Sequence, residues 1–337
     1  MSEITKKLVV SASPHFRSKT TTTSIMLDVI IAMLPALVAS VILFGINSLI
    51  LTVISVVSCV VFEYLSRKVM KRHNTIGDLS AVVTGMLLAF NLPSTMPYWM
   101  VIVGAFFAIV VAKQFFGGIG NNFVNPALIG RIVLMASYPS QIGNFVAPFS
   151  HKGGVDAVTT ATPLAQMTNV YSAENIGTAV DGAGLPSLLN MFLGVKGGCL
   201  GEVCIVALVV GFLYLVIRKV ISPVIPLVYV GTVAVAMLIA GKGDLSFVAY
   251  QVMAGGLVLG AVFMATDYTT SPVSFKGKII YAIGCGILTS LIRIFGSLPE
   301  GVSFSIIIMN ILVPHIEHLT TARPFGEIKE KKKKKEA

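Results

Sequence analysis

Charged residues are scarce in this chain. Asp, Glu, Lys and Arg together make up only 12% of its 337 residues, there is a single tryptophan, and 55% of the residues are hydrophobic. The mean hydropathy of +0.86 lies far outside the range of soluble domains. The scarcity of charge therefore excludes an ordinary soluble domain and predicts an all-α protein that crosses a membrane several times.

Cysteine patterns and nucleotide-binding motifs are also lacking. The four cysteines lie in apolar stretches and form no Cys-x-x-Cys pair, so the chain alone offers no ligand pattern for an iron–sulfur cluster. We expect Cys199 and Cys204 to be small buried residues. No Walker A motif, GxGxxG fingerprint or Ser-His-Asp constellation is found, so nothing supports ATP as the energy source. Residues 1–23 lack the apolar core of a cleavable signal.

Ten apolar stretches occupy most of the chain. Most approach the roughly 17–25 residues that a membrane-spanning helix needs, although two fall short. They predict ten spans in two halves, 24–138 and 199–319, which are joined by the loop 139–198 and flanked by the segments 1–23 and 320–337. The stretches cover residues 24–45, 48–65, 78–92, 97–116, 123–138, 199–217, 223–241, 245–266, 279–295 and 302–319.

The basic residues predict how the spans are oriented. If the N-terminus is cytoplasmic and ten spans alternate, 20 of the 25 lysines and arginines face the cytoplasm, as the positive-inside rule predicts. Both termini are then cytoplasmic, and the loop 139–198 faces outward from the plasma membrane of a prokaryote. This bias explains the net charge of +10 without a nucleic-acid partner. The run Lys331 to Lys335 is expected to be a solvated tail near anionic membrane lipids.

A four-residue motif occurs twice, at the start of the third and the eighth apolar stretch. Residues 77–80 and 243–246 both read Gly-Asp-Leu-Ser, and each motif is followed by an apolar stretch and a polar break that contains proline. Since five spans per half is an odd number, a repeat implies two halves of inverted orientation, whose short or broken helices line a central site. The alternative is that each motif only starts a helix, where Asp or Ser caps free N–H groups.

Several ionisable side chains lie within or beside the apolar stretches. A charge at the bilayer centre costs at least about 2.5–3.5 kcal/mol, so each should pair with a partner or line a wet cavity. Four of them lie at span ends, where snorkelling toward water is the simpler expectation: Glu63, Asp78, Asp244 and Arg293.

Snorkelling explains Asp267 and Arg131 less well. Asp267 ends the eighth stretch beside a run of hydroxyl side chains, which suits coordination of a cation. Together with the repeat-related Asp78 and Asp244, it is a candidate for an ion path. Arg131 follows a short polar segment with Asn125, and it suits either an anion or flavin carbonyl, or pairing with an acid.

The hydrophilic loop contains a threonine cluster between Asp156 and Leu164. Thr162-Pro163 is a good helix start, with a capping hydroxyl followed by proline at the first helical position. The same place favours a phosphate, because free N–H groups and the positive helix end meet there, so Thr162 is also a candidate for esterification to a flavin phosphate. The nearby Gly-rich segment 194–202 offers close backbone approach. Its Lys196 either neutralises the phosphate or is a solvated loop lysine.

Several segments resemble one family, which joins the D-type component of the Rnf electron-transport complex with the B-type component of the sodium-pumping NADH:quinone oxidoreductase. In that family the last threonine of a Ser/Thr-Gly-Ala-Thr motif carries FMN through a phosphoester, so the resemblance implies FMN on Thr162, although Thr160 stands where glycine is usual. We predict that further residues surround the flavin: Thr159, Thr160, Asn125, Arg131, Lys196, Gly197, Gly198 and Glu202. The resemblance rests on residues 13–16, 125–128, 156–164, 197–202, 263–267 and 299–301, and so runs along nearly the whole chain.

The resemblance implies an electron relay. Ferredoxin electrons pass through partner subunits and this FMN, NAD⁺ is reduced at another subunit, and Na⁺ or H⁺ is driven outward. The chain is then one subunit of a redox-driven ion translocase and has no complete activity alone. Riboflavin occurs in related subunits, and no residue places it here. The alternative from a different class is a flavin-free channel or transporter for a small solute, built from the same inverted repeats.

Overall fold

The computed structural model describes residues 20–150, 159–168, 182, 184–296 and 300–320. All regular secondary structure in these residues is helical, apart from one isolated antiparallel bridge between Val146 and Thr159. The prediction of an all-α protein is therefore confirmed. The N-terminal residues 1–19, the start of the threonine cluster at Asp156 and the run Lys331 to Lys335 lie outside the described residues.

Each apolar stretch that the sequence predicts contains at least one helix. The first half comprises α1 (Thr22–Phe44), α2 (Ile46–Val69), the 3-10 helix η1 (Ile76–Asp78), α3 (Ser80–Phe90), α4 (Tyr98–Phe106), the π-helix η2 (Phe107–Gln114) and α5 (Pro126–Ser137). The connecting loop holds α6 (Pro139–Ile142), α7 (Pro163–Met167) and α9 (Leu188–Leu193). The second half comprises α10 (Ile205–Ile217), α11 (Val224–Ala240), α12 (Leu245–Met253), α13 (Leu257–Leu259), the π-helix η4 (Gly260–Met264), α14 (Phe275–Phe295) and α15 (Val302–Thr320).

The lengths of these helices identify a multi-pass membrane protein. Four helices of the described residues, α1, α2, α14 and α15, are long and apolar enough to cross a membrane. The eighth stretch also passes this test when α12 is joined to the α13–η4 segment, but the two parts are bent by 63° at a break. Leu27, Ile31, Leu34 and Val38 form an exposed stripe along α1. Such an outward apolar stripe suits contact with lipid.

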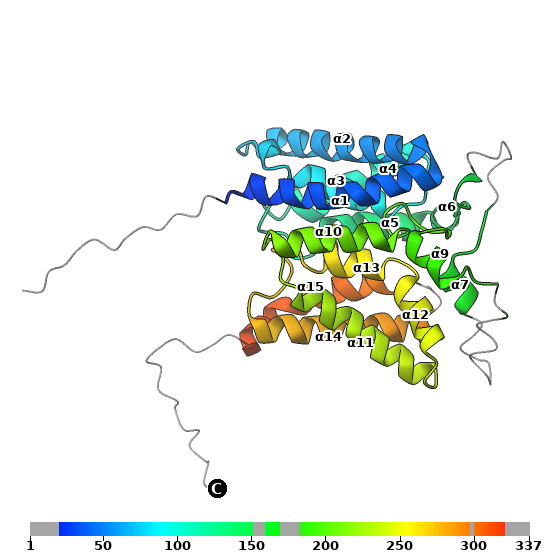
Figure 1. Cartoon of the computed structure of the whole chain (residues 1–337). Helices are drawn as coiled ribbons and strands as arrows, with labels where there is room; N and C mark the ends of the chain where they lie inside the picture. The colour runs from blue at the N-terminus through cyan, green and yellow to red at the C-terminus, as the bar shows by residue number, and fades with distance from the viewer. Residues whose placement is uncertain (1–19, 151–158, 169–181, 183, 297–299, 321–337) are drawn as a thin grey trace, which may run out of the picture.

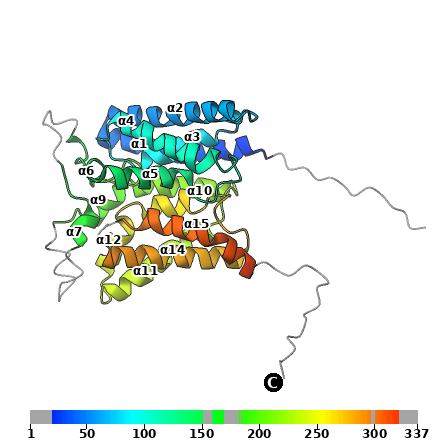
Figure 2. The same cartoon turned by 180° about the vertical axis from the view of Figure 1, so that it is seen from behind.

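The helices run roughly side by side (Figure 1): α2 to α5 lie together, and so do α11, α14 and α15, whereas α10 lies beside α1 of the first half. The first helices of the two halves, α1 and α10, are in contact, and so are the last helices, α5 and α15, which Figure 2 shows from behind. The start of α1 and the end of α15 lie at one end of the bundle, whereas α6, α7 and α9 cover the other end. If each half crossed the membrane an odd number of times, the loop between the halves would lie on the side opposite to both ends of the helical bundle.

The contact between α1 and α10 depends on a glycine. A Cβ atom on Gly211 of α10 would lie 2.3 Å from the backbone oxygen of Ala32 in α1. Small residues at such positions let two membrane helices approach backbone to backbone. Gly211 therefore sets how closely the two halves meet.

We expect Gly211→Ala to lower the free energy of unfolding by about 1–3 kcal/mol, because the added methyl group overpacks the contact between α1 and α10. Gly231 in α11 provides a matched control, since nothing lies within 4 Å of its Cβ position. There alanine should be neutral or stabilise the helix by up to about 1 kcal/mol. Thermal unfolding of both purified variants in detergent measures the difference. Equal melting temperatures would contradict the close contact.

Two residues that the sequence predicts to snorkel are buried instead. Glu63 has no exposed surface, and Arg293 is only 2% exposed. The prediction was wrong for both because their partners lie inside the protein. Lys113 pairs with Glu63, and the free backbone carbonyls of α12 accept hydrogen bonds from Arg293.

Candidate functional site

Thr162 precedes α7, a helix of five residues in the loop between the halves. Its backbone is extended, its Oγ1 accepts a hydrogen bond from the N–H of Ala165 at 3.2 Å, and Pro163 is the first helical residue. This is the helix start that the Thr-Pro pair predicts. Thr162 is half-buried, so the protein does not fully enclose its side chain.

Thr160, which stands in the motif's glycine position, packs against a different glycine. A Cβ atom on Gly197 would lie 2.6 Å from Thr160 Oγ1, so Gly197 makes room for the extra side chain. The N–H of Thr160 donates to the backbone oxygen of Phe145 at 2.9 Å. Thr160 Oγ1 is buried and has no hydrogen-bond partner among the described residues, whereas Thr159 is exposed. An unsatisfied hydroxyl therefore lies two residues from Thr162.

The helix that follows Thr162 docks on the break in the eighth stretch. Leu164 is buried in a small cluster with Met191 of α9 and Ala254 at the end of α12. It also lies 3.2 Å from the Cβ position of Gly255. Gly255 has a φ of +65°, a conformation that glycine adopts without strain. The loop that carries Thr162 thus rests directly on the broken span.

Two cations satisfy the backbone at this break. Arg293 of α14 donates to the carbonyl oxygen of Gln251 at 2.6 Å and to that of Ala254 at 3.3 Å. Lys196 donates to the carbonyl oxygen of Met253. The last carbonyls of a helix lack intrahelical partners and carry partial negative charge. The two cations therefore stabilise the end of α12 in the interior of the protein.

The short helix α3 of the first half ends beside the same region. The N–H of Gly201 donates to the carbonyl oxygen of Phe90 at 2.9 Å, and a Cβ on Gly201 would lie 2.3 Å from Phe90 Cβ. Arg131 of α5 donates to the side chain of Asn91 at 2.6 Å. The close backbone approach expected of the Gly-rich segment is therefore made to the end of α3.

Two acids complete a group that we call the break cluster: Arg131, Lys196, Glu202, Arg293 and Glu300. Arg131 forms a short ion pair with Glu300. Glu202 Oε1 accepts the N–H of Cys199 at 2.9 Å, while Glu202 Oε2 lies 3.1 Å from the Cβ position of Gly256 in the break. Of the roles that the sequence leaves open for Arg131, the structure shows the pairing with an acid.

Burial and neighbouring charges shift the pKa values of two loop residues in the break cluster, Lys196 and Glu300. Burial lowers the pKa of Lys196 to about 8, against the attraction of Glu202. Burial opposes the charged form of Glu300, but the positive charges of Arg131 and Arg293 outweigh it and lower the pKa of this carboxyl. The alternative of a solvated Lys196 was wrong, because this residue is only 3% exposed.

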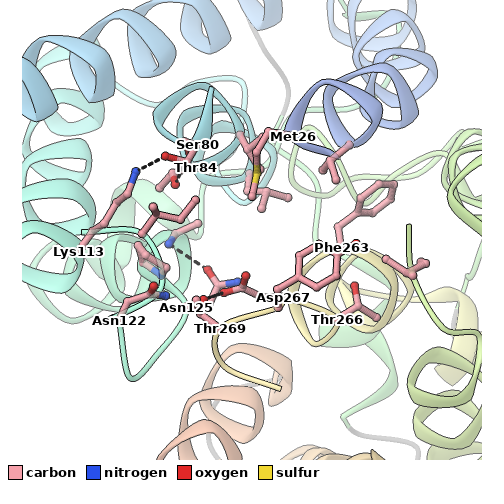
Figure 3. Close-up of a pocket in the computed structure, with 18 of the residues that line it drawn as sticks. Met26, Ser80, Thr84, Lys113, Asn122, Asn125, Phe263, Thr266, Asp267 and Thr269 are labelled. Atoms are coloured by element: carbon pink, nitrogen blue, oxygen red, sulfur yellow. Dashed lines mark hydrogen bonds between the residues drawn. The ribbon is translucent and has the colours of Figure 1, made fainter. Parts of the chain in front are cut away.

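A cavity of about 90 Å³ forms a second polar region (Figure 3). Asp267 lines it, and Asp267 Oδ2 accepts hydrogen bonds from Thr269 at 3.1 Å and from Thr270 at 3.2 Å. Asn125 also lines the cavity, where it caps α5 through the N–H of Ala127. Asn125 caps the start of α5, six residues and about 9 Å along the helix axis before Arg131. Asn125 therefore lies with Asp267 at this cavity, away from Arg131 in the break cluster.

Lys113 links this cavity to a buried ion pair. Its Nζ lies 2.8 Å from Glu63 Oε2 and donates to Ser80 Oγ at 2.6 Å, and the side chains of Lys113 and Glu63 are 3% and 0% exposed. Thr75 donates to the same Glu63 carboxylate at 2.8 Å. No sequence pattern indicated this pair, because Glu63 stood at the end of one predicted stretch and Lys113 lies in another, 50 residues away.

The repeat-related Asp244 caps the start of α12, and Asp78 ends η1 two residues before α3 begins. Asp78 Oδ1 accepts the N–H of Ser80 at 2.9 Å, and Asp244 Oδ1 accepts the N–H of Ser246 at 2.8 Å. The connection between α2 and α3 and the turn between α11 and α12 lie at opposite ends of the bundle (Figure 1). The structure therefore keeps these two acids apart, and of the three ion-path candidates Asp267 is the one that lines the cavity.

Sequence reasoning also missed the partners that hold the break cluster together. Glu300 lies in a short connection between α14 and α15. The sequence showed it as an acid between two apolar stretches and as part of the resembling segment 299–301, but neither signal gave it a partner. Gly255 and Gly256 were visible as a glycine pair inside the eighth stretch, which is a known sign of a helix break. In the part of the chain that the structure describes, no three His, Cys, Asp or Glu side chains are arranged to hold a metal ion.

Comparison with known proteins gives a match along nearly the whole chain. The model of the NQR2, RnfD, RnfE family matches residues 9–326. The chain is 46% identical over 331 residues to the D component of the Na(+)-translocating ferredoxin:NAD(+) oxidoreductase complex of Acetobacterium woodii, covering 97% of this chain and 98% of the relative. It is 42% identical to the D component of the proton-translocating ferredoxin:NAD(+) oxidoreductase complex of Clostridium ljungdahlii, over 94% of this chain and 96% of the relative. The D component of the ion-translocating oxidoreductase complex of Alcanivorax borkumensis is 35% identical, over 95% and 97% of the two chains.

Proposed function

The chain belongs to the NQR2, RnfD, RnfE family, and on that premise we propose that it is the D-type membrane subunit of an ion-translocating ferredoxin:NAD⁺ oxidoreductase complex. The observation that carries the proposal is the near full-length similarity to two relatives named as this component, at 46% and 42% identity. The chain is one member of a multisubunit redox complex and has no complete activity alone. Because these relatives are named for Na⁺ and for protons, the coupling ion is one of the two.

The proposal includes FMN esterified to Thr162. Bound FMN supplies one- and two-electron transfer. Three features of the described residues fit the group: the half-buried Thr162 at the start of α7, the unsatisfied hydroxyl of Thr160, and the small residue Gly197 beside Thr160. Lys196 donates a hydrogen bond to the backbone of α12, so its role is to stabilise the break, and other groups would bind the phosphate.

We also propose that ten spans form two inverted halves, with the Thr162 loop facing outward and both termini in the cytoplasm. The contacts of α1 with α10 and of α5 with α15, together with the broken span, support this plan. The ion path would run between the Asp267 cavity and the break cluster. Moving one charge against 100 mV costs about 2.3 kcal/mol. Electron transfer must therefore shift the equilibrium between two states of the ion path.

Intact-mass measurement of the purified chain, together with a denaturing gel viewed under ultraviolet light, tests the flavin. We expect the mass of one esterified FMN and a fluorescent band, and we expect Thr162→Ala to lose both. Thr160→Gly is the matched control, because it restores the usual motif two residues away and should keep the band. A wild-type chain without FMN, made in a host that has the flavin transferase, would overturn the proposal of attachment.

That outcome would favour the second candidate function, a flavin-free channel or transporter. The broken span and the cavity at Asp267 support this candidate. Solute uptake into vesicles by a colourless protein would then be the decisive measurement.

A further inference from the structure

Glu202 poses a chemical problem in the structure. The residue is 3% exposed, and one carboxyl oxygen, Oε1, accepts the N–H of Cys199. The other oxygen, Oε2, is buried and has no hydrogen-bond donor among the described residues. A buried carboxylate with an unsatisfied oxygen is strongly disfavoured. The oxygen points into the helix break, 3.1 Å from the Cβ position of Gly256.

A second carboxyl group lies beside Glu202 at the break. It belongs to Glu300, whose Oε1 lies 3.4 Å from the Cβ position of Gly255, the residue before Gly256. Two carboxylates this close cannot easily both be ionised, so one of them keeps a proton. A proton on Glu202 Oε2 would also supply the missing hydrogen bond, as a donor to Glu300.

The charges around the pair favour one proton rather than two. Arg131 of α5 and Arg293 of α14 face it, and Lys196 and the Cys199 thiol face it from the loop before α10. The broken span itself contributes backbone atoms and Gln251. Arg131 holds Glu300 as a carboxylate through their ion pair. The proton therefore belongs on Glu202.

We propose that Glu202 and Glu300 share one proton and form a proton-binding site at the break between α12 and α13. The proton enters through Glu300, whose side chain is 17% exposed. A hydronium ion gives the proton to Glu300 and leaves as water. The O–H bond of Glu300 then breaks as the O–H bond of Glu202 forms, and Glu300 returns to a carboxylate.

The site is also placed to respond to the electron carrier, a link that rests on the proposed function. Leu164, two residues after Thr162, contacts the Cβ position of Gly255, and Gly255 in turn lies against Arg293 and Glu300. Negative charge arriving on a flavin at Thr162 raises the proton affinity of nearby carboxylates. A reduced flavin therefore holds the proton on Glu202 more tightly and moves the titration of the pair to higher pH.

Infrared difference spectra of the purified full chain in lipid, recorded between mildly acidic and alkaline buffers, test the site directly. We expect a carbonyl band of a protonated carboxylic acid that persists at neutral pH, shifts in D₂O and is lost in Glu202→Gln. Glutamine keeps a donor toward Glu300, so the fold should survive. Asp28→Asn is the control, because Asp28 is a carboxylate paired with Arg218 and should leave the band unchanged.

Lys196→Met provides a second variant. Removing this cation disfavours the ionised pair, so the midpoint of the band should move upward by about 1–3 pH units. The absence of a titrating band from the wild type, or a band that Glu202→Gln leaves intact, would overturn the proposal. This holds whether or not FMN is present. If mass spectrometry finds FMN, its midpoint potential should depend on pH in the wild type and depend less in Glu202→Gln.

Discussion

Replacing Lys113 with methionine should be among the most damaging single changes in this protein. The substitution leaves Glu63 charged, with 0% of its side chain exposed and without its only cationic partner in the described ion pairs. Removing one member of a buried ion pair typically costs about 3–5 kcal/mol, because the remaining charge is neither solvated nor paired. Ser80 would lose a hydrogen bond at the same time. We therefore expect a large fall in melting temperature and a low yield of monodisperse protein.

The double variant Glu63→Gln/Lys113→Met separates the unpaired charge from a simple loss of packing. It removes both charges, while the glutamine can still accept the hydrogen bond that Thr75 donates to residue 63. Replacing a buried pair with neutral groups of similar size is often close to neutral, so most of the lost stability should return. If the double variant melted as low as the single one, the unpaired charge would not be the cause.

Replacing Arg131 with methionine should have an effect of similar size at the other polar region. Arg131 ties the first half to the second, because its guanidinium binds Asn91 at the end of α3 and Glu300 before α15. Its loss leaves two neighbouring acids with one cation fewer, at a cost of about 3–5 kcal/mol for the broken buried pair. Arg131→Lys should rescue only part of this, since one ammonium group does not reproduce the planar fork of the guanidinium.

Arg218→Met is the matched control for both substitutions. Arg218 pairs with Asp28 at 3.3 Å, and its side chain is 56% exposed. The Asp28 side chain is 11% exposed and keeps the hydrogen bond from the Tyr214 hydroxyl when Arg218 is removed. Exposed ion pairs contribute little to stability because water and salt screen them. Thermal unfolding of the four single variants in one detergent should therefore rank Lys113→Met and Arg131→Met far below the wild type, with Arg131→Lys between them and Arg218→Met close to it. An Arg218→Met variant that melts as low as Arg131→Met would refute the ranking by burial.

The sequence was most reliable where one physical property dominates. Hydropathy located the apolar stretches, and each of them contains a helix, since a backbone in lipid has to satisfy its hydrogen bonds internally. Local chemistry also predicted the start of α7, because Thr162-Pro163 supplies a cap and a proline at the first helical position. The hydroxyl run beside Asp267 also lies close to it in space, because these residues are neighbours in sequence, and two of its threonines donate hydrogen bonds to the carboxylate.

Polar side chains that lie far apart in the chain were predicted poorly. Glu63 and Lys113 are 50 residues apart, and Arg131 and Glu300 are 169 residues apart. Periodicity and composition carry no information about such pairs. The same limit explains why the contact of Lys196 with α12 was not among the two roles expected for it, because nothing local shows that α12 ends beside it with free carbonyls.

The amino-acid sequence by itself determined that the chain is a helical membrane protein, because burial of apolar surface and local capping depend on nearby residues. Its similarity to relatives along nearly the whole chain placed it in the NQR2, RnfD, RnfE family. Only the tertiary structure decided what the loop with Thr162 rests on. It placed α7 against the break after α12, and around that break it gathered cations and acids from α5, α14 and two separate loops. These groups meet because folding has to neutralise buried charges and free carbonyls, wherever in the chain their partners lie.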